Sequence, residues 1–213
     1  MNTRKEYFDE GSPQSEILYA ALEEFVQFGK KGARMQSIAD RAGVNKALLH
    51  YYFSNKENLH QEVLRRIFQY AFSRVSASLE EASEPRDQMR ELISRYYDFI
   101  AEFPELPRLM IHEIHTNPDE IVAMFSQIFT SREDRNYPQA IFEVITQGIQ
   151  KGQFRQVDPR QFMITILSTI LFFFVAKPLL TKVIGIENEE KFIIQRKAHI
   201  QDVLLTYLER DKA

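Results

Sequence analysis

RMQSIADRAGVNKALLHYYF, residues 34–53, is the stretch that decides the architecture expected for this chain. It contains two runs with apolar side chains at helical spacing, joined by a glycine. Gly43 can adopt the positive φ of a tight helix-ending turn, and Asn45 can accept a backbone N–H as the cap of the next helix. The pattern predicts a helix-turn-helix, a unit that places its second helix in the DNA major groove. The apolar positions are Ile38, Ala39 and Ala42 in the first run, and Leu48, Leu49 and Phe53 in the second.

The composition indicates an almost wholly helical protein with a sizeable core. Among 213 residues there are only 7 glycines and 8 prolines, and long runs of alternating polarity are absent from the sequence. The chain has no cysteine, which excludes disulfides and cysteine metal sites and suits a cytoplasmic protein. No apolar signal segment opens the N-terminus, which agrees with that location.

Positive charge is concentrated around the predicted helix-turn-helix. The whole chain carries a net charge of −3. Between Gly29 and Lys56, however, six cationic side chains accompany one carboxylate, Asp40, which gives a local charge of +5. This distribution is typical of a protein that contacts phosphate with one end, although a short basic stretch alone is often just a solvated surface. The cations are Lys30, Lys31, Arg34, Arg41, Lys46 and Lys56.

Helix signals extend along the rest of the chain. The first helix is expected to begin at Ser12-Pro13 and to end at Gly29. A capping box, Ser54-x-x-Glu57, is expected to open a helix of about 25 residues that ends before Pro85 and connects two domains. Gly148 and Gly152 are expected to loosen the end of a later helix. Further helices are expected near residues 86–103, 108–114, 119–129, 138–149, 162–181 and 189–209, with a loop at 130–136.

The helix expected at residues 162–181 is the most apolar. Its apolar core, residues 162–176, is shorter than the roughly 20 residues that a bilayer span needs, so we expect no membrane span. A helix that is apolar nearly all round must be buried on nearly all sides. We therefore expect another subunit to cover part of it.

The first third of the chain resembles the TetR family of bacterial repressors. The family pattern IA-x-x-A-G-V-S-x-x-x-L-Y-x-x-F-x-x-K-x-x-L is specific because it fixes many positions at fixed spacing. The chain departs from it at Asn45, where the family usually has Ser, at His50, where it usually has Tyr, and at Arg34, where it often has a capping Thr. Further along, Gly152-x-Phe154 and Asp158-Pro159 also agree. The matching positions in the pattern are Ile38, Ala39, Ala42, Gly43, Val44, Leu49, Phe53, Lys56 and Leu59.

The resemblance implies an all-α fold in two domains. Residues 1–57 would form a three-helix DNA-binding domain with the helix-turn-helix, and a long helix would join it to a ligand-binding and dimerisation domain at residues 58–213. It further implies a homodimer through the last two helices, a double-stranded DNA operator as partner, and a small ligand. Ligand binding would swing the long helix and change the separation of the two reader helices.

DNA contacts are predicted from side-chain chemistry at the matched positions. Gln36, Lys46 and Tyr51 are the candidates for reading bases, because Gln pairs with adenine, Lys donates to guanine, and an aromatic ring packs on a thymine methyl group. The sequence leaves open which of His50, Tyr51 and Tyr52 contacts DNA, and packing between helices is the alternative for Tyr52. Secondary candidates for the bases are Ser37, Asn45 and Ala47, and candidates for phosphate are Arg34, His50, Tyr52 and Lys56.

The second domain offers candidate ligand contacts but no metal site. Its Met and aromatic side chains could line a pocket for an apolar ligand, although such a stripe is also ordinary core. His112 and His115 lie three residues apart, but no third ligand accompanies them, so we expect no metal and no cofactor. The candidate ligand contacts are Tyr96, Phe99, Met110, Met124, Phe125, Phe142 and Phe172.

The sequence therefore predicts a DNA-binding transcriptional regulator, most simply a repressor that releases its operator on binding a small apolar molecule. The alternative is a regulator without such an inducer, controlled by a protein partner. The sequence has no phosphate-binding glycine loop, no nucleophile motif and no paired-carboxylate constellation, so we expect no enzymatic activity. It leaves open the ligand, the operator, the regulated genes, and repression against activation.

Overall fold

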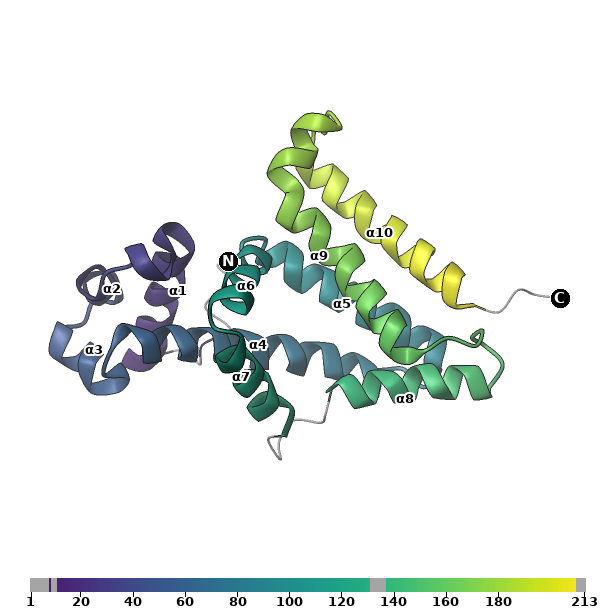
Figure 1. Ribbon diagram of the computed structural model, residues 1–213, viewed down its shortest axis with the longest axis horizontal. Coiled ribbons are helices and arrows are strands. Elements are labelled where there is room, and N and C mark those ends of the chain that lie inside the picture. Colours follow the sequence, from purple (N-terminus) through teal and green to yellow (C-terminus); the bar gives the residue numbers. More distant parts are fainter. Residues whose placement is uncertain (1–7, 9–10, 131–136, 210–213) are drawn as a thin grey trace. The chain divides into compact units, whose positions relative to one another are not determined.

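The computed structural model describes residue 8, residues 11–130 and residues 137–209, and ten α-helices make up this described part (Figure 1). It contains no β-strand, and its single β-bridge joins Phe154 to Glu209. The predicted all-α fold is confirmed. The helices are α1 (Pro13–Gly32), α2 (Met35–Ala42), α3 (Lys46–Phe53), α4 (Lys56–Glu81), α5 (Pro85–Glu102), α6 (Leu106–Thr116), α7 (Pro118–Thr130), α8 (Tyr137–Gln150), α9 (Pro159–Val183) and α10 (Glu189–Leu208).

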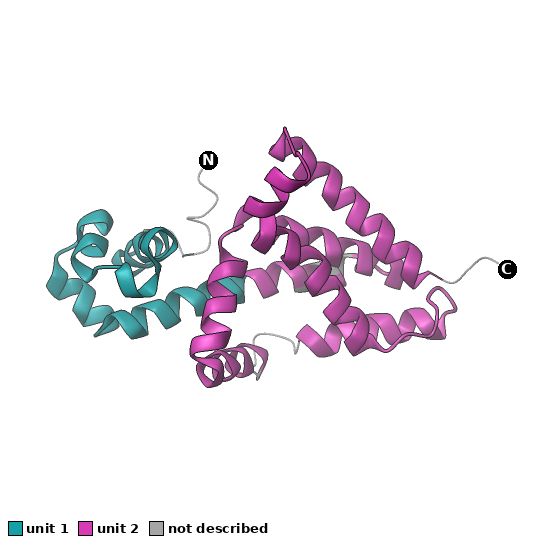
Figure 2. Ribbon diagram, turned by 45° about the horizontal axis from the view of Figure 1, so that its top comes forward, with its two compact units in different colours: residues 1–70 teal, residues 71–213 magenta. Residues whose placement is uncertain are grey.

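The chain forms two compact units, residues 1–70 and residues 71–213 (Figure 2). The 26-residue helix α4 begins in the first unit and ends in the second, which matches the length expected for the connecting helix. The domain boundary expected between residues 57 and 58 stays a prediction. Of the loop expected at 130–136, Thr130 belongs to α7 and the remainder lies outside the described residues.

Local signals set both ends of α1. The Ser12 side chain accepts the N–H of Ser15 at 3.1 Å, the Ser15 hydroxyl accepts the N–H of Ser12 at 3.2 Å, and Pro13 occupies the first turn. Near the other end, Gly29 has φ 66° and interrupts the helical backbone three residues before the helix ends. The predicted start of this helix is confirmed, whereas the end predicted at Gly29 is an interruption, and the helix ends at Gly32.

The start of α4 differs from the predicted capping box. The side chain of Asn55 accepts the N–H of Asn58 at 2.9 Å, so the cap is Asn55 and not Ser54. Ser54 instead has φ 56°, in the left-handed region, where it turns the chain between α3 and α4. The Ser-x-x-Glu pattern was misleading because an equally good capping residue follows the serine directly.

In the second unit, α5 packs against α8, α9 and α10, and the core lies between these helices. The buried Tyr97 of α5 donates its hydroxyl hydrogen to the backbone oxygen of Ile193 in α10 at 2.9 Å. Gly148 does not loosen α8. A Cβ at Gly148 would stand 2.0 Å from Cδ2 of Phe154, so the absence of a side chain admits this buried ring against the helix.

The helix α9 is longer than expected. Asp158 caps it and Pro159 opens it, as predicted, but it continues for 25 residues to Val183 and includes Pro178. By length and hydropathy it could cross a membrane, and only 22% of its most apolar 18-residue window is buried within the unit. Its length therefore does not exclude a bilayer span, contrary to the argument from residues 162–176. Large apolar side chains exposed on α9 include Ile164, Leu167, Phe172, Leu179 and Val183.

Candidate nucleic-acid interface

The turn between α2 and α3 has the geometry that its sequence predicts. Gly43 lies in the left-handed region at φ 68° and ψ 24°, and its N–H bonds to the last turn of α2. The side-chain oxygen of Asn45 accepts the N–H of Leu48 at 2.8 Å and so caps α3. With Leu49 and Phe53 buried beneath it, α3 presents an outer face. That face carries the exposed residues Lys46, Ala47, His50 and Tyr51.

A buried carboxylate supports the start of α2. The residue preceding this helix, Arg34, gives no side-chain cap, as expected for a cationic side chain. Its backbone N–H instead reaches Oε1 of Glu24 at 3.3 Å, and Oε2 of the same carboxylate lies 3.6 Å from Nη2 of Arg41. Glu24 is 2% exposed, and sequence reasoning missed it. The available signal was a carboxylate inside the apolar stripe of α1.

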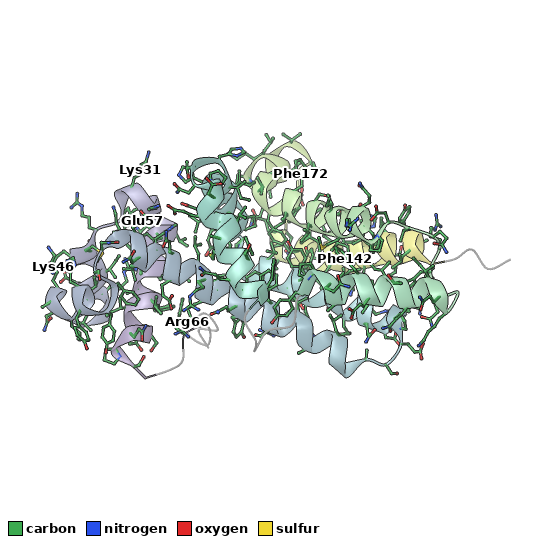
Figure 3. All side chains as sticks on the ribbon, turned by 60° about the horizontal axis from the view of Figure 1, so that its bottom comes forward. Lys31, Lys46, Glu57, Arg66, Phe142 and Phe172 are labelled. Atoms are coloured by element: carbon green, nitrogen blue, oxygen red, sulfur yellow. The ribbon has the colours of Figure 1, made fainter. Side chains whose placement is uncertain are left out.

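Five of the six cations of this region fall into two groups. Lys30 forms an ion pair with Glu57, and Arg41 forms one with Glu24, so their charges are partly balanced within the first unit. Lys31, Arg34 and Lys46 are exposed and have no ion pair among the described residues. Lys31 and Lys46 are labelled in Figure 3. Lys31 entered the charge count but not the predicted contacts, so it is a further candidate for phosphate.

Lys56 has protein partners at its ammonium group. Its Nζ donates to the backbone oxygens of Ala33 at 3.0 Å and of Lys31 at 3.2 Å. These carbonyls lie at the junction of α1 and α2, so Lys56 fastens the first turn of α4 to that junction. A phosphate contact by Lys56 stays a prediction, and the geometry gives the residue a structural role beside it.

The predicted base-reading residues differ in how free their polar atoms are. The exposed Gln36 donates from Nε2 to Asp40 at 2.8 Å, which leaves its carbonyl oxygen available. Asn45 uses its side-chain oxygen as the α3 cap, and Ser37 is half-buried. Lys46 has its whole ammonium group available, and Ala47 beside it is exposed.

The three rings after Leu49 also differ. The backbone oxygen of Ser54 lies 2.8 Å from Nδ1 of His50, and because a carbonyl only accepts, Nδ1 carries the hydrogen. The Nε2 of a neutral His50 is then an acceptor, and this ring could donate to phosphate only when protonated. Tyr51 is 80% exposed and Tyr52 is 37% exposed, with their rings edge to face at 5.5 Å. Tyr51 is therefore the most accessible of the three rings.

The seven predicted ligand contacts do not form one group. Phe125 belongs to a cluster of four aromatic rings from α4, α7 and α8, in which Phe72 lies 5.0 Å from the Tyr137 ring and 6.0 Å from the Phe125 ring. Phe172 is 64% exposed on α9, because the helix turns this side chain away from the core. Figure 3 labels Phe142 and Phe172. Of the other predicted contacts, Phe99 and Met110 are buried, and Tyr96, Met124 and Phe142 are half-buried.

Metal-binding side chains do not cluster in the part of the chain that the structure describes, where no group of three could hold an ion. His112 and His115 are exposed on α6. Glu113 between them is buried and accepts a hydrogen bond from the Asn117 side chain at 2.9 Å. This carboxylate is therefore engaged within α6 and its C-terminal cap.

The sequence matches two known domain families. Residues 17–63 match the bacterial regulatory proteins of the tetR family, and residues 85–204, more than half of the chain, match the tetracyclin repressor-like C-terminal domain. Together the two matches cover the helix-turn-helix and most of the second unit.

Individual relatives and solved structures agree with these two domain matches. The chain is 29% identical over 146 residues to the HTH-type transcriptional activator FasR of Mycolicibacterium smegmatis, with 68% of this chain and 64% of that protein covered. It is 26% identical over 194 residues to the HTH-type transcriptional regulator RutR of Escherichia coli K12, with 89% and 87% covered. The solved structure of the transcriptional regulator FadR from Bacillus subtilis, in complex with stearoyl-CoA, has a TM-score of 0.68 at 19% identity, covering 91% of this chain and 98% of that one.

Proposed function

This chain belongs to the TetR family of transcriptional regulators, and we propose that it is a repressor that binds operator DNA as a homodimer and releases it on binding a small apolar ligand. One observation carries the DNA-binding part of this proposal. The Asn45-capped helix α3 presents Lys46, His50 and Tyr51 on a face that the protein leaves uncovered.

The exposed cations divide into base and phosphate contacts. Lys46, in the first turn of α3, is the base-reading residue, with Gln36 and Tyr51 beside it. Arg34 and Lys31 contact phosphate, since both are exposed and neither has an ion pair among the described residues. Lys56 and Glu24 hold the surrounding backbone in place.

The homodimer is proposed to form through α9 and α10. Both helices expose large apolar side chains, among them Ile164 and Phe172 on α9 and Val203 and Tyr207 on α10. An apolar surface of this kind is covered by a partner or by lipid. We propose that a partner subunit covers this surface, because the family match and the relatives' names describe regulators that act on DNA. For the same reason we place the protein in the cytoplasm.

A ligand effect on DNA binding requires a connection to α4. The aromatic cluster of Phe72, Phe125, Phe129 and Tyr137 supplies one, because Phe72 lies on α4 and the other rings lie on α7 and α8. A ligand that favoured another packing of these rings would shift α4 and thereby the separation of the two reader helices. The stearoyl-CoA bound in the FadR structure has a long apolar acyl chain, which supports a ligand with an apolar part.

The proposal is tested by titrating DNA from upstream of the protein's own gene with the full chain. We expect salt-dependent binding that is much tighter than binding to an unrelated duplex of equal length. Lys46→Ala should lower affinity for the specific duplex alone, whereas Lys31→Ala should weaken both duplexes alike. The same titration would be repeated with duplexes from upstream of the neighbouring genes. The proposal would be contradicted if the chain bound none of these duplexes more tightly than the unrelated duplex.

A further inference from the structure

A half-buried arginine of the second unit has no counter-charge among the residues that the structure describes. Arg196 lies on α10, one helical turn before the buried Ile200, and its guanidinium carbon stands 5.4 Å from the ring centre of Phe173 on α9. Its Nε is buried and has no hydrogen-bond partner in the described part of the chain. Among the described residues, Arg196 forms no ion pair.

Two polar groups near Arg196 in the sequence or by charge already have partners. The neighbouring cation Lys197 pairs with Asp98 at 2.7 Å. The Tyr97 hydroxyl donates to the backbone oxygen of Ile193, and burial raises the pKa of this phenol to about 12, against the opposing effect of the Arg196 charge. Tyr97 is therefore neutral at physiological pH and cannot serve as the counter-ion.

Several aromatic rings lie around Phe173. The Phe173 ring lies 5.5 Å from that of Phe192 and 5.2 Å from that of Phe174, and Phe174 lies 5.6 Å from Tyr97. Stacking over Phe173 uses one face of the guanidinium and leaves its N–H edges for hydrogen bonds. A partly buried cation without an anion is unfavourable, and a carboxylate would complete it with two parallel charge-assisted bonds.

We propose that Arg196 anchors the carboxylate of the ligand, and that the ligand is an apolar carboxylic acid whose body packs against these rings. This inference rests on the proposed function and assigns the chemical class of its effector. The counter-charge could come from a ligand bound within one subunit or from a carboxylate of a second subunit. A ligand within one subunit is favoured, because Arg196 stacks on Phe173, which is 4% exposed, and not on its neighbour Phe172, which is 64% exposed.

Two adjacent cations on α10 provide a matched pair of variants. Arg196→Gln removes the cation that has no ion pair among the described residues. Lys197→Gln removes the neighbouring cation, which is already paired with Asp98. Binding of dodecanoate and of 4-butylbenzoate to the full chain would be measured by calorimetry, with dodecanol and 4-butylbenzyl alcohol as uncharged probes. We expect at least one acid to bind at least tenfold more tightly than its alcohol, and Arg196→Gln to lose about tenfold or more of that affinity. Lys197→Gln should keep it.

Operator binding and subunit mass of the same variants separate the possible failures. We expect both ligand-free variants to remain dimers and to bind operator DNA like the parent, and the acid to release DNA from the parent and from Lys197→Gln. Dissociation of Arg196→Gln into monomers would overturn the inference, because the counter-charge would then belong to the other subunit. Failure of both acids to outbind their alcohols would also overturn it. Operator binding by the parent chain in those cases would leave the proposed regulator standing.

Discussion

The ammonium group of Lys56 donates to the backbone oxygen of Ala33 at 3.0 Å, across the junction between α1 and α2. Lys56, which was expected to contact only phosphate, therefore also joins the first turn of α4 to the junction of α1 and α2. Because α4 runs from the first unit into the second, this contact is one point at which a shift of α4 would reach α2 and α3.

Replacing Lys56 should therefore affect folding as well as DNA binding. We expect Lys56→Ala to lower the free energy of unfolding of the first unit by about 1 kcal/mol, since two hydrogen bonds from a half-exposed cation are lost. A urea titration, monitored by amide hydrogen exchange in α1 and α2, measures this free energy of unfolding. Lys31→Ala is the control, because its side chain is exposed and makes no such bond. An unchanged stability in Lys56→Ala would show that the contact has no structural weight.

Lys31→Ala should act on DNA binding alone. One phosphate contact fewer should reduce the slope of log affinity against log salt concentration by about 1, with little change in sequence preference. A series of titrations between low and moderate salt gives the slope. An identical slope for the variant and the parent would remove Lys31 from the phosphate contacts.

The cap of α3 should be measurable by itself. Asn45→Ala removes the acceptor of the Leu48 N–H and should destabilise α3 by about 1 kcal/mol, whereas Asn45→Ser should retain most of the stability. Faster hydrogen exchange at Leu48 in Asn45→Ala, reversed in Asn45→Ser, is the expected readout. Equal exchange in all three proteins would mean that the cap contributes nothing.

Gly148 should not tolerate a side chain. Gly148→Ala places a Cβ 2.0 Å from the Phe154 ring and should destabilise the second unit by about 1 to 3 kcal/mol. In a Phe154→Ala background the same substitution should cost much less, because the ring that it meets is gone. Thr146→Ala, an exposed position on the same helix, is the control. Equal costs of Gly148→Ala in both backgrounds would contradict the close approach.

The exposed face of α9 should hold the dimer together. Phe172→Glu is expected to convert the dimer into monomers in detergent-free buffer, whereas Ile114→Glu, at an exposed apolar position on α6, should leave the mass unchanged. Sedimentation velocity distinguishes the two states. A parent chain that stays monomeric, or that remains in solution only with detergent, would instead favour lipid as the cover of this face.

The sequence predicted the fold well where local chemistry decides the backbone. Ser12, Gly29, Gly43, Asn45 and Asp158 have the capping or turn roles that their residue types favour, because each acts on the backbone within a few residues. Predictions that depended on distant partners did less well. Neither the Lys56 contact with Ala33 nor the packing of Phe154 on Gly148 has a signature in residue type or spacing.

The candidate site shows the same limit. Sequence pattern indicated which face of α3 is exposed, because helical periodicity alone separates Leu49 and Phe53 from Lys46 and Tyr51. It could indicate that Glu24 stands in the apolar stripe of α1, but not its role, which depends on the Arg34 N–H and the Arg41 side chain meeting one carboxylate. Nor could it separate Phe172 from Phe173, since both are aromatic and only the direction of α9 turns one outward.

Selection of duplexes from a random-sequence library by the full chain tests whether α3 reads DNA sequence in a two-fold dimer. We expect enrichment of an inverted repeat whose half-sites are centred one helical turn of DNA, about 34–36 Å, or a multiple of it apart. Selection with Lys46→Ala should change the preferred bases within each half-site and keep the spacing. Recovery of unrelated sequences without a repeat, or of the same bases with Lys46→Ala, would contradict this expectation.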